Sequence, residues 1–152
     1  MELIRLLDER EVAVLADAVE AMKRAHLRHY EEAGAEAVHS RLRALYEAMR
    51  ESVRTRRLAP IESHAGAVAR DRHRMGYGIG EVQTAFNVLE EAVWHRIVAE
   101  VAPAQLAEAL ALVATALGAG KDELARTWVS LATRTQAPAL DLAALFRGTE
   151  GV

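Results

Sequence analysis

The sequence contains no cysteine among its 152 residues. Disulfide bonds, thiolate nucleophiles and cysteine-ligated zinc are therefore excluded, and a reducing cytoplasm is the expected compartment. Positive charge is not in excess either, because the net charge is -3, which opposes general attraction to nucleic acid or anionic lipid. Aromatic residues make up only 5% and do not interleave with the arginine runs, so we expect no single-strand binding by base stacking.

Long apolar runs are also missing. The most apolar segment, residues 109–119, is alanine-rich and closely flanked by Glu108 and Lys121, which makes it too short and too weakly hydrophobic to span a bilayer. The first residues carry acidic side chains early and do not form a secretory signal. We therefore expect a soluble protein with no membrane partner. Its size and its 51% of apolar residues suit one domain with one core.

Apolar residues recur at intervals of three and four almost everywhere, which predicts an all-α fold, globin-like or bundle-like. The first of about five main helices would begin after Asp8 as N-cap, with Glu11 as its capping-box partner, and would carry Val12, His26 and His29 on its apolar face. The expected helices run from Asp8 to Gly34, along the stripe 38–53, from Pro60 to Gly76, through 82–97, and from Pro103 to about 131.

The last of these helices is predicted to be long, because its apolar stripe keeps one phase across Gly118 and Gly120. We expect those small residues to admit a close neighbour. The chain is divided into a helical domain, 1–137, and a short amphipathic C-terminal tail, 138–152, whose apolar residues are Leu142, Leu145 and Phe146.

Three glycines alternate in the stretch RMGYGIGE, at Gly76, Gly78 and Gly80. A dinucleotide-binding loop needs the pattern G-x-G-x-x-G after a strand, whereas here the third glycine comes one residue early and the preceding segment has a helical pattern. The stretch is therefore interpreted as a joint, in which Gly76 takes the left-handed conformation that ends one helix before the next begins.

Six histidines raise the question of a metal site. A di-iron bundle requires two Glu-x-x-His pairs, and the chain has one, Glu36 to His39. His26 with His29, and Glu91 with His95, would supply two or three ligands at most. Buried histidines bonded to a neighbour are commoner than ligands, so we expect no metal and no other cofactor.

Positively charged residues are concentrated in two short runs of the sequence. Within them, the best candidate for contact with an anion or a partner protein is the pair Arg70 and Arg74, which lie one helical turn apart. The alternative is a solvated face paired with nearby Asp71 and Glu62. No serine lies in a strand-turn-helix elbow and no carboxylate pair stands out, so the sequence predicts a protein that is not an enzyme.

The run R-x-x-x-G-Y-x-I-x-E-V-Q-x-A-F-N-V-L-E-E-A-V-W, from Arg72 to Trp94, resembles the central signature of the amino-terminal sensor domain of RsbR-type stressosome co-antagonists, the RsbRD type. Upstream, YEEAGAEAVHSRLRALYEAM is similar to the way such domains join an early helix to the next. The resemblance covers roughly residues 12–131 and implies a haem-free, globin-like fold that tends to form homodimers and acts as a regulatory input in the bacterial general stress response.

The resemblance transfers structural roles and no catalytic residue. Its matched structural positions are Gly76, Tyr77, Glu81, Val82, Phe86, Leu89 and Trp94. The signalling module that follows such domains is not in the chain, so we expect an isolated domain or a free-standing relative that acts in trans on a signalling protein.

Two alternatives from other classes stay open. In the first, the globin-like core holds haem, with His64, His73 or His95 as the axial ligand. In the second, a small molecule occupies a pocket between the helices.

Overall fold

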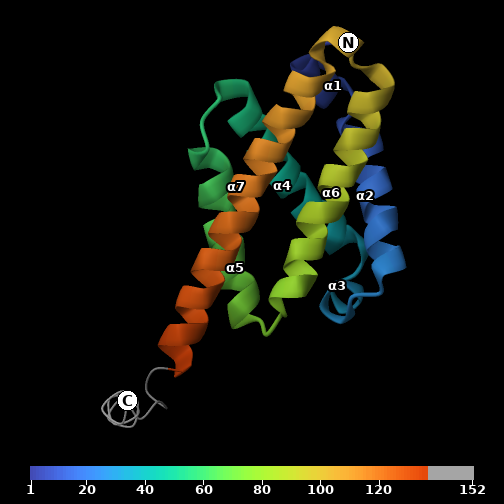
Figure 1. Ribbon diagram of the computed structural model, residues 1–152. Coiled ribbons are helices and arrows are strands. Elements are labelled where there is room, and N and C mark those ends of the chain that lie inside the picture. The colour runs from blue at the N-terminus through green and yellow to red at the C-terminus, as the bar shows by residue number, and fades with distance from the viewer. Residues whose placement is uncertain (137–152) are drawn as a thin grey trace, which may run out of the picture.

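The computed structural model describes the backbone of residues 1–136 and the side chains of residues 1–133. Within that part the chain forms seven α-helices, which confirms the predicted all-α class (Figure 1). They are α1 Leu3–Glu9, α2 Glu11–Ala25, α3 Arg28–Ala33, α4 Ala35–Thr55, α5 Ala59–Arg74, α6 Ile79–Glu100 and α7 Pro103–Gln136. The tail 138–152 lies outside the described residues, and the globin-like arrangement remains a prediction.

The helices pack around one core. The most extensive packing is between α5 and α7, followed by α2 with α6 and α6 with α7, while α4 contacts α2 and α5. Tyr46 and Phe86 are the largest side chains buried almost completely. Figure 1 shows α7 crossing the bundle, with its far end extending beyond the ends of its neighbours.

The N-terminal prediction was wrong in three respects. Asp8 lies inside α1, whose buried leucines were not recognised as a helix, and α2 follows Arg10 without a side-chain cap. Val12 is 82% exposed and does not belong to the apolar face. The single helix expected up to Gly34 is divided at His26, which adopts a left-handed conformation with φ 51°. The short helices α1 and α3 therefore add to the five that the sequence predicted.

The glycine stretch forms the predicted joint. Helix α5 ends at Arg74, Gly76 has φ +84°, and α6 begins at Ile79, so in the described structure the stretch connects two helices and follows no strand. A left-handed φ is accessible to glycine without the strain that a Cβ would cause. Only Gly76 uses this freedom, because Gly78, at φ -78°, is ordinary extended backbone.

The long last helix is also confirmed, because α7 continues through Gly118 and Gly120. Gly120 is buried, and a Cβ placed there would lie 2.9 Å from Ile61 Cγ1 and 3.0 Å from Phe86 Cε1. The close neighbour that the small residues were expected to admit is therefore the pair α5 and α6. Gly118 is exposed, and a Cβ added to it would have nothing within 4 Å.

Candidate functional site

Four side chains meet beside the glycine joint. They come from α3, α4, α5 and the joint itself. We call Tyr30, Arg41, Arg72 and Tyr77 the arginine–tyrosine corner. Arg41 Nη1 donates a hydrogen bond of 2.6 Å to the Tyr77 hydroxyl. The guanidinium carbons of Arg41 and Arg72 lie 5.6 and 5.9 Å from the centroid of the Tyr77 ring. Tyr30 meets Tyr77 edge to face at 5.4 Å. Both cations therefore lie within the range of a cation–π interaction with a buried ring.

A carboxylate clasp lies next to this corner. Glu81 Oε1 accepts a hydrogen bond of 3.1 Å from the backbone N–H of His29, and Oε2 accepts one of 3.0 Å from the N–H of Gly78. His29 Nδ1 is 2.7 Å from Oε2, which requires the ring proton on Nδ1. The imidazole also stacks on Tyr77 at 4.6 Å. Glu81 thus holds the start of α6 and the first turn of α3 together.

The clasp perturbs the carboxyl group of Glu81. Burial raises its pKa, but the hydrogen bonds from Gly78 and His29, together with the charge of His29, outweigh that effect, so the pKa lies below the ordinary value. The sequence marked Glu81 and Tyr77 as structural residues and missed their partners His29 and Arg41. These partners are 52 and 36 residues away, and no short-range pattern connects them.

Beneath the corner lies a small cavity of about 20 Å³. Its polar lining is Tyr30, Arg41, His64 and Arg72, and its other walls are apolar side chains of α4, α5 and α6. Burial and the charge of Arg72 lower the pKa of His64, so its neutral form is favoured. A cavity of this size holds one water-sized particle.

The structure does not bring the three histidines considered for haem into one place. His64 lines the small cavity, whereas His73 packs edge-on to Trp128 at 5.3 Å. His95 is exposed, with Nε2 4.0 Å from Glu91. In the part of the chain that the structure describes, no three potential metal ligands of the His, Cys, Asp and Glu types lie together.

The arginines singled out for anion or partner contact have separate surroundings. Arg74 forms an ion pair of 2.7 Å with Asp71, as the solvated-face alternative expected. Arg70 lies against Gly66 and lines an open hollow with Glu123 and Thr127 of α7. A joint role of the two arginines remains a prediction.

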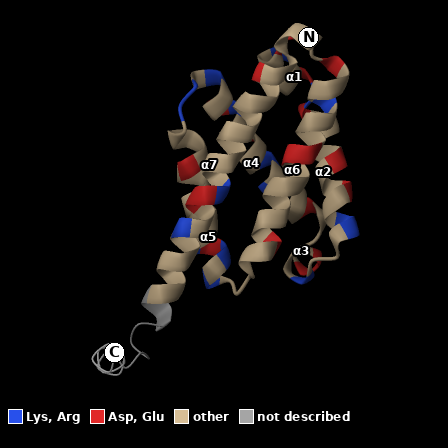
Figure 2. Ribbon diagram, viewed as in Figure 1, with Lys and Arg blue, Asp and Glu red and all other residues tan. Residues whose placement is uncertain are grey.

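Apolar side chains of α6 and of the first half of α7 are exposed or half-buried. Trp94 and Val98, one turn apart on α6, are 39% and 61% exposed. The turn at residues 101–102 and the ion pair of 3.5 Å between Lys121 and Glu90 place them beside the first half of α7. Figure 2 shows few Lys, Arg, Asp or Glu residues on that half of α7. We define the α6–α7 face as Trp94, Val98, Ala107, Leu110, Ala111 and Ala114, none of them fully buried.

Helix α7 is unusually apolar for its exposure. On length and composition alone, Pro103–Thr133 would suffice to cross a membrane, with a hydropathy of 1.2 in an 18-residue window of which 28% is buried. The prediction from the sequence took only residues 109–119 as the apolar segment, and that segment is too short to span a bilayer. This is weak support for a membrane span, since core helices of soluble proteins meet the same criterion.

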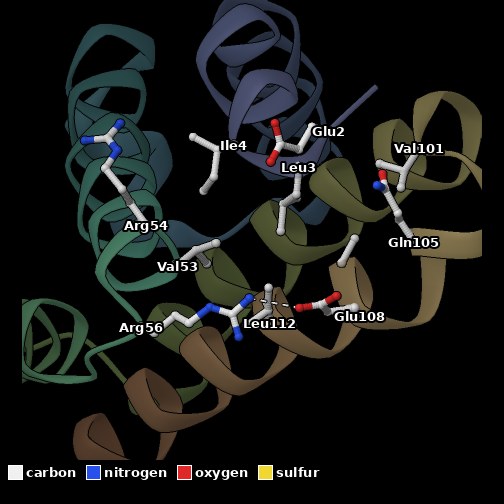
Figure 3. A pocket seen from close by; sticks show the side chains of 11 residues that line it. Glu2, Leu3, Ile4, Val53, Arg54, Arg56, Val101, Gln105, Glu108 and Leu112 are labelled. Carbon is white, nitrogen blue, oxygen red and sulfur yellow. Dashed lines mark hydrogen bonds and ion pairs between the residues drawn. The ribbon is translucent and has the colours of Figure 1, made fainter.

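A wider pocket opens at the other end of the bundle, between α1, the end of α4 and the start of α7 (Figure 3). Its volume is about 190 Å³, and Leu3, Val53 and Leu112 form part of its floor. An ion pair of 2.9 Å between Arg56 and Glu108 lies at its edge. This volume is below that of most drug-sized ligand sites.

No curated protein and no solved structure matches the chain significantly. A family model does match, over residues 9–144, and its description is the RsbT co-antagonist protein rsbRD N-terminal domain. The match covers most of the chain and includes the glycine joint, the clasp and the α6–α7 face. It agrees with the resemblance found in the signature from Arg72 to Trp94. The chain therefore belongs to the family of RsbT co-antagonist rsbRD N-terminal domains, which are regulatory, non-catalytic domains of stress-response signalling.

Proposed function

We propose that this chain is a homodimeric input domain of stress-response signalling, which dimerises through the α6–α7 face. Membership of the family implies RsbT-type signalling partners. The observation that carries the proposal is the uncharged α6–α7 face, where Trp94 and Val98 are exposed on a helix that is otherwise well packed. Exposed apolar patches that are larger than those on typical soluble monomers mark interaction sites.

A second copy of the chain suits this face better than a charged partner does. The six residues that define the face are all apolar. The charged side chains next to them, Glu108 and the pair Lys121 and Glu90, already have ion-pair partners, so the face offers apolar contact more than charge complementarity. Its small residues Ala107, Ala111 and Ala114 recur at intervals of four and three, which lets another helix approach closely. In a two-fold dimer each copy would present the same patch, and the two α6–α7 hairpins would form a four-helix bundle.

Light scattering during size-exclusion chromatography tests the dimer at micromolar concentration. We expect twice the mass of the 16.6 kDa chain. The variant Val98→Glu places a charge in the centre of the face and should shift the protein to a monomer, because an unpaired charge is costly to desolvate in an apolar interface. Val98 is exposed in the single chain, so the fold itself should tolerate the change.

The matched control is Val12→Glu, which adds the same charge at an exposed valine of α2 outside the face. This variant should remain a dimer. A monomeric unmodified protein would contradict the proposal, as would a Val98→Glu variant that still forms a dimer. Recovery of the protein only with membranes or detergent would assign the apolar surface of α7 to lipid and would also contradict it.

A further inference from the structure

The cavity beneath the arginine–tyrosine corner is lined by two arginines, and the nearby carboxylates do not fully balance their positive charge. Among the described residues, Arg41 has no ion pair with a carboxylate, and its resolved hydrogen bond goes to the neutral Tyr77 hydroxyl. Arg72 contacts Asp71, but Asp71 also pairs with Arg74. The two guanidinium groups at the cavity therefore have only a share of one carboxylate to balance them.

One side chain that lines this cavity has an unused donor. Arg72 Nε is buried and has no hydrogen-bond partner within the described part of the chain, and the Arg72 side chain is only 12% exposed. A buried donor without a partner destabilises the fold, and a buried unpaired charge does so more strongly, so such groups normally have a water molecule or a counter-ion beside them. Two groups beside the cavity can accept a hydrogen bond. The Tyr30 hydroxyl already interacts with the Arg72 side chain, and the other is a nitrogen of neutral His64.

The size of the cavity restricts what can enter it. About 20 Å³ is enough for one water-sized particle, and it excludes phosphate, sulfate and organic acids. The apolar walls, which include Val82 and Phe86, strengthen any electrostatic interaction inside because they keep the local dielectric constant low.

We propose that this cavity binds one halide-sized monovalent anion between Arg41 and Arg72. The anion supplies negative charge for both guanidinium groups and a hydrogen-bond acceptor for Arg72 Nε. It connects α4 to α5 beneath the glycine joint. This site is separate from the α6–α7 face, so its occupancy and the dimer can be tested independently.

Bromide locates the site directly in the unmodified protein. Crystals grown with sodium bromide should show an anomalous scattering peak in the cavity, in contact with both guanidinium groups. An ordered water molecule without an anomalous signal would overturn the proposal. A peak that appears only at bromide concentrations far above about 0.15 M, the physiological ionic strength, would indicate an adventitious ion only and would overturn it as well.

Thermal unfolding at constant ionic strength supplies the solution measurement. Replacement of sodium gluconate, whose anion is too large for the cavity, by sodium chloride should raise the Tm by a few degrees and reach saturation. The variant Arg41→Gln should abolish the chloride effect. The matched control Arg43→Gln, at an exposed arginine of α4 that pairs with Glu47, should keep it. Equal Tm values in the two salts, or a chloride effect that persists in Arg41→Gln, would overturn the proposal.

Discussion

At the residue scale, one carboxylate holds two distant segments together. Glu81 accepts hydrogen bonds from Gly78 and from the backbone and ring of His29, so it caps α6 and fastens α3 at once. The sequence indicated that Glu81 matters structurally, because it is one of the positions matched by the family resemblance. It could not indicate the partner, because a contact across 52 residues depends on how the helices pack.

The pKa of Glu81 gives a pH-dependent prediction. Because the pKa in the folded state lies below the ordinary value, the clasp stabilises the fold above the ordinary pKa of about 4.3 and loses its effect as the pH falls through the folded-state value. The variant Glu81→Gln should lower the free energy of unfolding at pH 7 by about 1–2 kcal/mol. In thermal melts between pH 7 and pH 3, this difference from the unmodified protein should shrink towards the acid end.

The control is Glu91→Gln, which neutralises an exposed carboxylate of the same helix, and its melting curve should follow that of the unmodified protein. A Glu81→Gln variant as stable as the unmodified protein at pH 7 would show that the clasp contributes nothing in solution.

At the scale of the elements, apolar periodicity predicted the longer helices and missed the short ones. Helices α4, α5, α6 and α7 each extend over several turns, so their stripes repeat often enough to be recognised. Helix α1 has seven residues and α3 has six, which gives one or two repeats. The break at His26 could not be predicted, because a non-glycine residue in the left-handed region carries no strong sequence signal.

The two glycines of α7 offer a matched pair of substitutions. Gly120→Ala should destabilise the protein by about 1–3 kcal/mol, because its Cβ would press on Ile61 and Phe86. Gly118→Ala meets no neighbour and should stabilise it by about 0.5–1 kcal/mol, because alanine loses less backbone entropy in a helix. Chemical denaturation of the two variants measures both effects. If Gly120→Ala were the more stable of the two, the close approach of α5 and α6 to α7 would be wrong.

At the scale of the whole molecule, the described residues form an all-α domain that belongs to the rsbRD N-terminal family. The sequence predicted this class and the family. It did not predict the arginine–tyrosine corner, whose members come from α3, α4, α5 and the joint, nor the small cavity beneath it. Those features follow from tertiary packing, which the spacing of residues along one helix does not report.

Haem binding remains the alternative to test at this scale. The cavity beside His64 has a volume of about 20 Å³. Pockets for ligands as large as haem occupy hundreds of cubic ångströms, so the cavity is far too small for it. We therefore expect protein expressed with excess haem to show no Soret band. A stoichiometric Soret band that disappears in His64→Ala would show that the core opens to admit the macrocycle, and would favour a gas or redox sensor.

The length of α7 has a mechanical consequence. Its 34 residues correspond to a rod of about 51 Å, and its far end extends beyond the other helices (Figure 1). A tilt of about 10° about its first turn would carry that end roughly 9 Å, by the rise per residue of an ideal helix. Because α7 crosses Ile61 and Phe86 at Gly120, about half-way along its length, any displacement at that crossing is about doubled at the far end, where another protein could detect it.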